Sequence, residues 1–210
     1  MAKLVGDAVV LLSGGVDSAA LAAFTRPALA LFVDYGQIPA RAEARASRAI
    51  ADRLGVPYRA VRLPLNDFGG GLLLDGVPLD DAPSPEWWPY RNQFLGTAGA
   101  AIALQHNLTK VLLGSVRGDG DRHMDGSPQF YRALTTLTSL QEGSVQVEAP
   151  ALELTTVELV RKARLDSAIL ALTVSCHRAA RPCGDCPGCW KRQQVFAELD
   201  VFQPTVTSNA

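Results

Sequence analysis

Residues 11–21 read Leu-Leu-Ser-Gly-Gly-Val-Asp-Ser-Ala-Ala-Leu, and this stretch governs the fold that the sequence predicts. The apolar run before it, residues 8–12, has the length and β-branching of a buried parallel strand. The run after it, residues 18–24, consists of good helix formers. Residues 13–18 are therefore predicted to turn tightly from a strand into the N-terminus of a helix.

Such a turn favours an anion, above all a phosphate. Gly14 and Gly15 let a ligand approach the backbone, and the helix N-terminus offers N–H groups and a positive dipole end. Ser13 and Ser18 add hydroxyl donors, and Asp17 can hold a metal or cap the helix. The G-x-x-x-x-G-K-[ST] pattern and its lysine are absent from the turn. S-G-G-x-D-S instead resembles the pyrophosphate loop of the ATP pyrophosphatase superfamily, with an ordinary glycine turn as the alternative.

Composition limits the class of protein. The chain has 210 residues, 48% hydrophobic and 20% charged, which suits a globular α/β domain with a real core. A formal net charge of -1 gives no general attraction to nucleic acid. The sequence has neither a long apolar span nor a signal-peptide pattern, so we expect a cytoplasmic protein with reduced cysteines.

Strand and helix patterns alternate after the first turn. Residues 28–34 and 58–63 read as strands, and residues 41–54 read as an amphipathic helix closed by Gly55. This order predicts a doubly wound, mostly parallel α/β sheet. Ligands bind such sheets beyond the carboxyl ends of the strands, so residues 13–18 and 34–37 are expected to face one nucleotide.

The pattern stops over residues 64–90, which are rich in glycine and proline and contain Trp87 and Trp88. A loop of this length is either a surface excursion pinned by the two tryptophans or a lid over the site. Further along, residues 91–104 and 128–134 read as helices, and residues 109–115 and 145–150 read as strands. Thr155 to Glu158 is a capping box that opens another helix. Residues 118–125 are polar and suit either a solvated loop or a metal or substrate site.

All four cysteines lie near the C-terminus: Cys176, Cys183, Cys186 and Cys189. Two C-x-x-C steps share Cys186, and four thiolates so close together can surround a tetrahedral zinc. A closed shell of this kind predicts a structural zinc rather than one that activates water. His123 and His177 are then expected to be surface residues. We divide the chain into a nucleotide-binding domain, 1–150, and a helical zinc-binding region, 151–210.

The chain resembles the 7-cyano-7-deazaguanine synthase family of queuosine biosynthesis over nearly its whole length. The resemblance is carried by residues 13–18, by Phe-Val-Asp-Tyr-Gly-Gln at 32–37, by Pro-Tyr-Arg-Asn at 89–92, by Ser-Pro-Gln-Phe at 127–130, and by the cysteine pattern with Arg192. It implies a Rossmann-like fold of the adenine nucleotide α-hydrolase type. It also implies a homodimer and the use of ATP, Mg²⁺ and Zn²⁺.

The family converts 7-carboxy-7-deazaguanine and ammonia to the nitrile by adenylating first the carboxylate and then the amide. By resemblance, Ser13, Asp17, Ser18, Arg91 and Asn92 are the expected catalytic residues, and Tyr35, Arg91 and Asp125 are expected to meet the substrate. Tyr35 or Trp88 would offer a stacking surface. The residues expected around the nucleotide are Leu12, Ser13, Gly14, Gly15, Val16, Asp17, Ser18, Asp34 and Gln37.

One segment departs from the family pattern. Relatives carry an Asn-x-x-Asp-Tyr-Ser-Gly-Tyr-Pro-Asp-Cys-Arg-like stretch beside the substrate, whereas residues 115–127 here keep only Asp125 from its end. Two alternatives therefore stay open beside the synthase. One is a paralogue that adenylates another carboxylate or stops at the amide, and the other is a zinc-stabilised partner subunit without catalysis.

Overall fold

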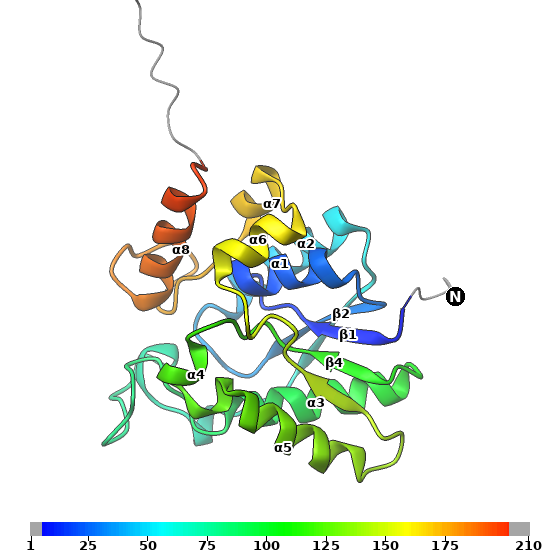
Figure 1. Ribbon diagram of the computed structural model, residues 1–210. Helices are drawn as coiled ribbons and strands as arrows, with labels where there is room; N and C mark the ends of the chain where they lie inside the picture. The colour runs from blue at the N-terminus through cyan, green and yellow to red at the C-terminus, as the bar shows by residue number, and fades with distance from the viewer. Residues whose placement is uncertain (1–5, 202–210) are drawn as a thin grey trace, which may run out of the picture.

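A five-stranded parallel sheet forms the centre of the computed structural model, which describes residues 6–201 (Figure 1). Its order is β3-β2-β1-β4-β5, with every neighbouring pair parallel. The strands are β1 Ala8–Leu11, β2 Leu29–Asp34, β3 Tyr58–Arg62, β4 Lys110–Leu112 and β5 Gln146–Glu148. The order reverses direction at β1, so the predicted doubly wound sheet is confirmed.

Helices cover both faces of the sheet (Figure 1). On one face lie α1 Val16–Thr25, α2 Ala40–Leu54, α6 Thr156–Ala163 and α7 Ser167–Leu172. On the other lie α3 Arg91–Gln105 and α5 Pro128–Ser139. Alternate residues of β1 divide between two cores, because Val10 packs with α1 and α6 while Val9 packs with α3 and α5. Burial on both faces explains the continuous apolar sequence of this strand.

Local capping signals set several helix ends where the sequence predicts them. Gly55 ends α2 with a left-handed φ of 69°. The Thr155 hydroxyl accepts from the Glu158 N–H, and the Glu158 carboxylate accepts from the Thr155 N–H, which confirms the capping box of α6. The short helix α7 was not predicted; Asp166 caps its N-terminus by accepting from the Ile169 N–H at 2.7 Å.

The irregular segment 64–90 contains two short 3₁₀ turns, η1 Asn66–Phe68 and η2 Gly71–Leu73. Trp88 is 1% exposed and packs edge-on against Tyr35, with ring centroids 5.0 Å apart. A buried indole of this size anchors the segment to the sheet end. Trp88 is therefore a core residue rather than the exposed stacking surface that the sequence offered.

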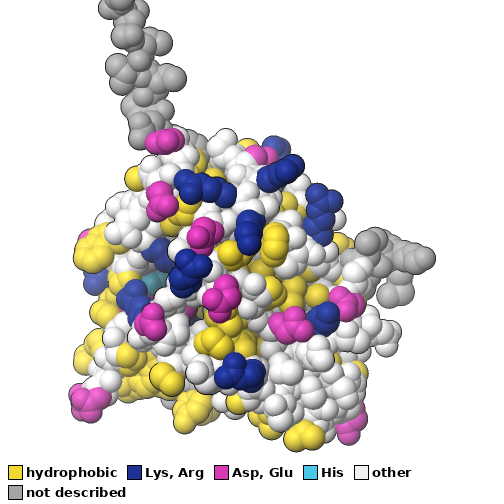
Figure 2. All heavy atoms as spheres, viewed as in Figure 1, with side chains coloured by type: hydrophobic (Ala, Val, Ile, Leu, Met, Phe, Trp, Pro, Cys, Tyr) yellow, Lys and Arg dark blue, Asp and Glu magenta, His cyan; other side chains and the backbone are white. Residues whose placement is uncertain are grey.

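The helices α6 and α8 contribute apolar residues to the first core, while Cys176, Cys186 and Cys189 form a small buried cluster of their own. Val157, Leu159 and Val160 of α6 pack with β1 and α1, and Val195 of α8 Pro187–Glu198 joins the same core. The remaining elements, α4 Asp119–Arg122 and η3 Met124–Gly126, border the carboxyl ends of the strands. Acidic and basic side chains are interspersed on the face shown in Figure 2. Within residues 6–201, no helix combines the length and apolar character needed to cross a membrane.

Candidate active site and metal centre

A cavity of about 370 Å³ opens at the carboxyl ends of β1, β2 and β4. The turns that follow these three strands line it with Ser13, Tyr35 and Ser115. This is the position at which doubly wound sheets bind ligands. Of the residues expected around the nucleotide, the following line the cavity: Leu12, Ser13, Gly15, Val16, Asp17, Ser18 and Gln37.

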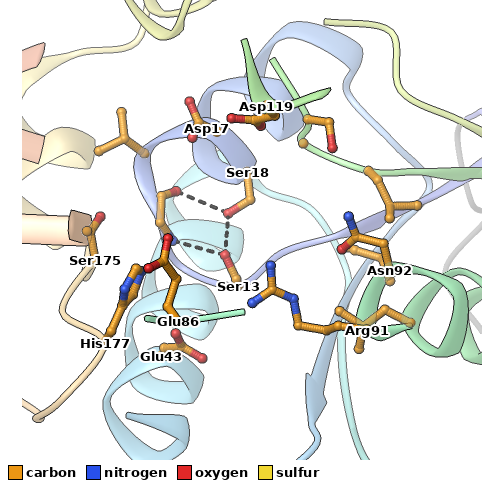
Figure 3. A pocket seen from close by; sticks show the side chains of 18 of the residues that line it. Ser13, Asp17, Ser18, Glu43, Glu86, Arg91, Asn92, Asp119, Ser175 and His177 are labelled. Carbon is orange, nitrogen blue, oxygen red and sulfur yellow. Dashed lines mark hydrogen bonds between the residues drawn. The ribbon is translucent and has the colours of Figure 1, made fainter. Parts of the chain in front are cut away.

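The Ser13–Ser18 turn presents its polar groups to the cavity (Figure 3). The Ser13 and Ser18 hydroxyls lie 3.1 Å apart, and the Gly15 N–H donates to Ser13 Oγ at 3.3 Å. Gly15 is the N-cap of α1, and no side chain caps this helix end. The first N–H groups of α1 therefore remain available to an anion in the cavity.

Gly14 has a structural role instead of lining the cavity. Its φ is 88°, and a Cβ built there would lie 2.9 Å from the Ala46 Cβ and 3.0 Å from the Glu43 carbonyl oxygen. The glycine lets the turn approach α2 closely. Its carbonyl oxygen accepts from the Val174 N–H at 2.8 Å, which joins the turn to the C-terminal region.

Asp17 is held between two distant parts of the chain. Its Oδ1 accepts from the Thr156 hydroxyl at 2.5 Å, and its Oδ2 accepts from Lys191 Nζ at 2.9 Å. Lys191 Nζ also lies 3.6 Å from an Asp119 oxygen. Burial lowers the pKa of Lys191, but Asp17 and Asp119 outweigh that effect and raise it, so the ammonium stays charged. Lys191 thus places a positive charge beside the first turn of α1, where the local sequence has no lysine.

Asp34 and Gln37 differ in position. Asp34 is not among the residues that line the cavity; its carboxylate accepts from the Gly36 N–H and lies 3.8 Å from Arg62 Nε. Gln37 does line the cavity, but it accepts from the Tyr35 N–H at 2.9 Å and donates to Glu43 at 2.7 Å. Both side chains therefore stabilise the turn after β2.

Glu43, Tyr35 and Arg91 are buried titratable residues that line one wall of the cavity, and the sequence identified them only in part. Burial raises the pKa of Glu43 to about 7, although Gln37 and Arg91 act in the opposite direction. Burial also raises the pKa of Tyr35 to about 12. Burial works against the charge of Arg91, but Tyr35 and Asp125 outweigh it and raise its pKa. Figure 3 shows the Arg91 guanidinium pointing toward Ser13.

Asn92 and Asp125 bind each other at the start of α3. The Asn92 N–H donates to Asp125 Oδ2 at 3.3 Å, and Asn92 Nδ2 donates to the Asp125 carbonyl oxygen at 3.0 Å. Both residues line the cavity. Their mutual bonds fix the 118–125 segment against α3, which is a positioning role.

His123 and His177 also line the cavity, together with Glu86. Both histidines are half-buried instead of fully exposed on the surface, and the Nδ1 atom of each ring is buried. The sequence carried no signal for this grouping. The three residues come from the irregular segment 64–90, from the end of α4 and from the cysteine region.

The four cysteines gather as predicted. The sulfur atoms of Cys176, Cys183, Cys186 and Cys189 all lie within 4.8 Å of one another. Cys183 Sγ and Cys189 Sγ are 3.9 Å apart, and four thiolates each about 2.3 Å from a tetrahedral zinc would be about 3.8 Å apart. Cys186 Sγ accepts from the N–H groups of His177 and Cys189 at 3.4 Å each. This donor set fits a closed structural zinc site.

Comparison with known proteins gives a consistent picture. The family model described as queuosine biosynthesis protein QueC matches residues 7–200. The chain is 34% identical to a 7-cyano-7-deazaguanine synthase of Acidobacterium capsulatum, over 94% of this chain and 94% of that protein. It is also 34% identical to one of Azoarcus sp. (strain BH72), over 94% and 95%. Among solved structures, NMN synthetase from Francisella tularensis shares the fold, with a TM-score of 0.51, 16% identity and coverage of 95% and 79%.

Proposed function

Because this chain belongs to the QueC family of queuosine biosynthesis proteins, we propose that it is an ATP-dependent ligase that converts 7-carboxy-7-deazaguanine and ammonia to 7-cyano-7-deazaguanine. The observation that carries the proposal is the uncapped N-terminus of α1, which opens on the cavity beside Ser13, Ser18 and Lys191. These donors and this charge suit the pyrophosphate that leaves when ATP adenylates an oxygen.

The reaction proceeds through two adenylations. An oxygen of the acid attacks the α-phosphorus of ATP, and pyrophosphate leaves. Ammonia then attacks the acyl carbon of the adenylate. The bond from this carbon to the bridging oxygen breaks, AMP leaves with that oxygen, and loss of a proton from nitrogen gives the amide. The amide oxygen attacks the α-phosphorus of a second ATP and pyrophosphate leaves. Elimination of AMP, which takes the former amide oxygen, with loss of the two amide protons then gives the nitrile.

The residues around the cavity have separate roles in this reaction. The α1 N–H groups, the Ser13 and Ser18 hydroxyls and Lys191 bind the pyrophosphate. Arg91, which points toward Ser13, attracts the acid carboxylate (Figure 3). Asn92 and Asp125 fix the N-terminus of α3 in place through their mutual hydrogen bonds. Tyr35 and Glu43 complete the wall behind Arg91.

Two metals accompany this assignment. The Asp17 and Asp119 carboxylates lie on one side of the cavity and are the oxygen donors that Mg²⁺ uses alongside phosphates and water. When bound there, Mg²⁺ would neutralise charge on the pyrophosphate. Zn²⁺ would be held by the four cysteines and would stabilise the C-terminal wall. We also propose that the protein is cytoplasmic and forms a homodimer. Light scattering on the purified protein would test the dimer.

The decisive experiment incubates the protein with the acid, ATP, MgCl₂ and ammonium, and reads both nucleotide and product mass. The expected products are the nitrile with AMP and pyrophosphate. Release of ADP and phosphate would overturn the pyrophosphatase chemistry. Accumulation of the amide would favour the shortened reaction, and absence of turnover with this acid would favour a paralogue or a partner subunit.

A further inference from the structure

Three buried polar atoms in the cavity wall have no hydrogen-bond partner among residues 6–201: Glu86 Oε2, His123 Nδ1 and His177 Nδ1. They belong to three segments that are far apart in sequence. Figure 3 shows Glu86 and His177 on the same side of the cavity, near the Ser13 turn. A buried polar atom without a partner is costly in a folded protein, so three in one wall indicate a ligand that pairs with them.

Glu86 is held in a way that leaves one oxygen for a ligand. Its side chain is 8% exposed, and its Oε1 lies 2.5 Å from Arg122 Nη2 in an ion pair. His123 Nε2 lies 3.9 Å from the same oxygen and 3.4 Å from the Ser84 hydroxyl. These contacts fix the carboxylate at Oε1. Oε2 is the oxygen without a partner, and an ionised carboxylate only accepts hydrogen bonds.

The charges around Glu86 favour uncharged N–H donors over a metal ion. Arg122 already balances the carboxylate charge. Among the described residues, the donor atoms that come together closely enough to hold a metal are those of the four cysteines, and Glu86, His123 and His177 are not in that group. The subsite therefore needs N–H groups for the carboxylate and a polar partner for each imidazole nitrogen.

The deazaguanine ring of the acceptor carries such a pattern on one edge. Its exocyclic amine and ring N–H are adjacent donors, and a carbonyl oxygen lies beside them as an acceptor. Asp125, which the sequence offered for this role, already accepts from the Asn92 N–H. That bond uses only Oδ2 of Asp125, just as Arg122 pairs only with Oε1 of Glu86. Glu86 differs in that its second oxygen is buried without a partner among the described residues.

We propose that Glu86, flanked by His123 and His177, forms the subsite that binds the amine and ring N–H edge of the acceptor. The carboxylate accepts from these donors, and an imidazole Nδ1–H donates to the ring carbonyl. This assignment rests on the proposed function, because it presumes the deazaguanine acid as acceptor. It makes Glu86 a specificity residue contributed by the irregular segment 64–90.

The test compares the acid with its analogue that lacks the exocyclic amine. In the wild-type protein, kcat/KM for the acid should exceed that for the analogue by about tenfold or more. The reason is that the Glu86 carboxylate has no amine donor to bond when the analogue is bound. Glu86→Gln should raise the KM for the acid by a similar factor and reduce this preference, while the KM for ATP changes less than about twofold. Glu142→Gln, at an exposed position outside the cavity, is the matched control.

The outcomes separate this inference from the function on which it rests. If the wild type does not turn over the acid, the proposed function fails and this subsite falls with it. If the acid is converted but the wild type accepts both compounds equally, the subsite alone is wrong. That measurement needs no variant, so it decides the matter even if Glu86→Gln does not fold. A folded Glu86→Gln protein that keeps the full preference would also overturn the assignment.

Discussion

Lys191 is the residue that most changes the sequence interpretation of the nucleotide site. The turn at residues 13–18 lacks the lysine of ordinary phosphate loops, yet Lys191 Nζ reaches Asp17 from 174 positions away. The sequence around a lysine in α8 does not predict this contact, because the contact depends on how the fold places α8 beside α1. Lys191 in α8, the helix that Cys186 caps and that contains Cys189, thus supplies the charge that the loop lacks.

Replacing Lys191 tests whether this charge acts on the pyrophosphate. Lys191→Met should lower kcat/KM for ATP by about tenfold to a thousandfold, since one preorganised charge on a developing anion has an effect of that size. Lys191→Arg should retain part of the activity. Lys162→Met, on the exposed side of α6, is the control. Initial rates of pyrophosphate release give the measurement, and wild-type rates in Lys191→Met would contradict the role.

Glu43 makes the stability of the ligand-free protein depend on pH. Its pKa is raised from 4.5 to about 7 by burial, so the folded state binds more protons than the unfolded state between these values. Stability should therefore fall as pH rises from about 4.5 to about 7, and level off above. Glu43→Gln should remove that part of the slope. Melting temperatures at pH 5 and pH 8 test this, and an unchanged difference in the variant would refute it.

At the scale of elements, the sequence predicted what local pattern determines. The strand β1, the turn after it and the caps of α2 and α6 follow from apolar runs and capping residues that lie next to one another. The helix α7 has six residues, too few for a periodic pattern to show. The environments of Glu86, His123 and His177 depend on packing between segments, which no local pattern encodes.

The helix α8 should depend on zinc for its position. Cys186 is 0% exposed, caps α8 by accepting from the Cys189 N–H, and is one of the four clustered thiols. We expect one zinc per chain, and Cys186→Ser should lose it. Because Lys191 lies on the same helix, ATP cleavage should fall together with zinc content. Elemental analysis alongside the activity assay measures both, and a zinc-free variant with full activity would contradict the coupling.

At the scale of the whole molecule, the division at residue 150 remains a prediction about organisation. The sequence suggested it because the cysteines and the strand pattern lie in different parts of the chain. In the structure, α6 and α8 pack into the core that β1 and α1 build, and the C-terminal region lines the nucleotide cavity. Shared burial of this kind favours one cooperative unit, because exposing either part uncovers apolar surface on the other.

Leu159 provides the test of that cooperativity. It is 0% exposed and packs in the shared core, so Leu159→Ala should lower the free energy of unfolding by about 2–5 kcal/mol. Leu172→Ala, at a position that is 37% exposed, should cost much less and serves as the control. Circular dichroism and a chromophoric zinc chelator can be followed in the same thermal scan. If the core is shared, loss of helix signal and release of zinc should have one midpoint, and Leu159→Ala should shift both equally. Release of zinc at an unshifted, lower temperature would show that the two regions unfold independently.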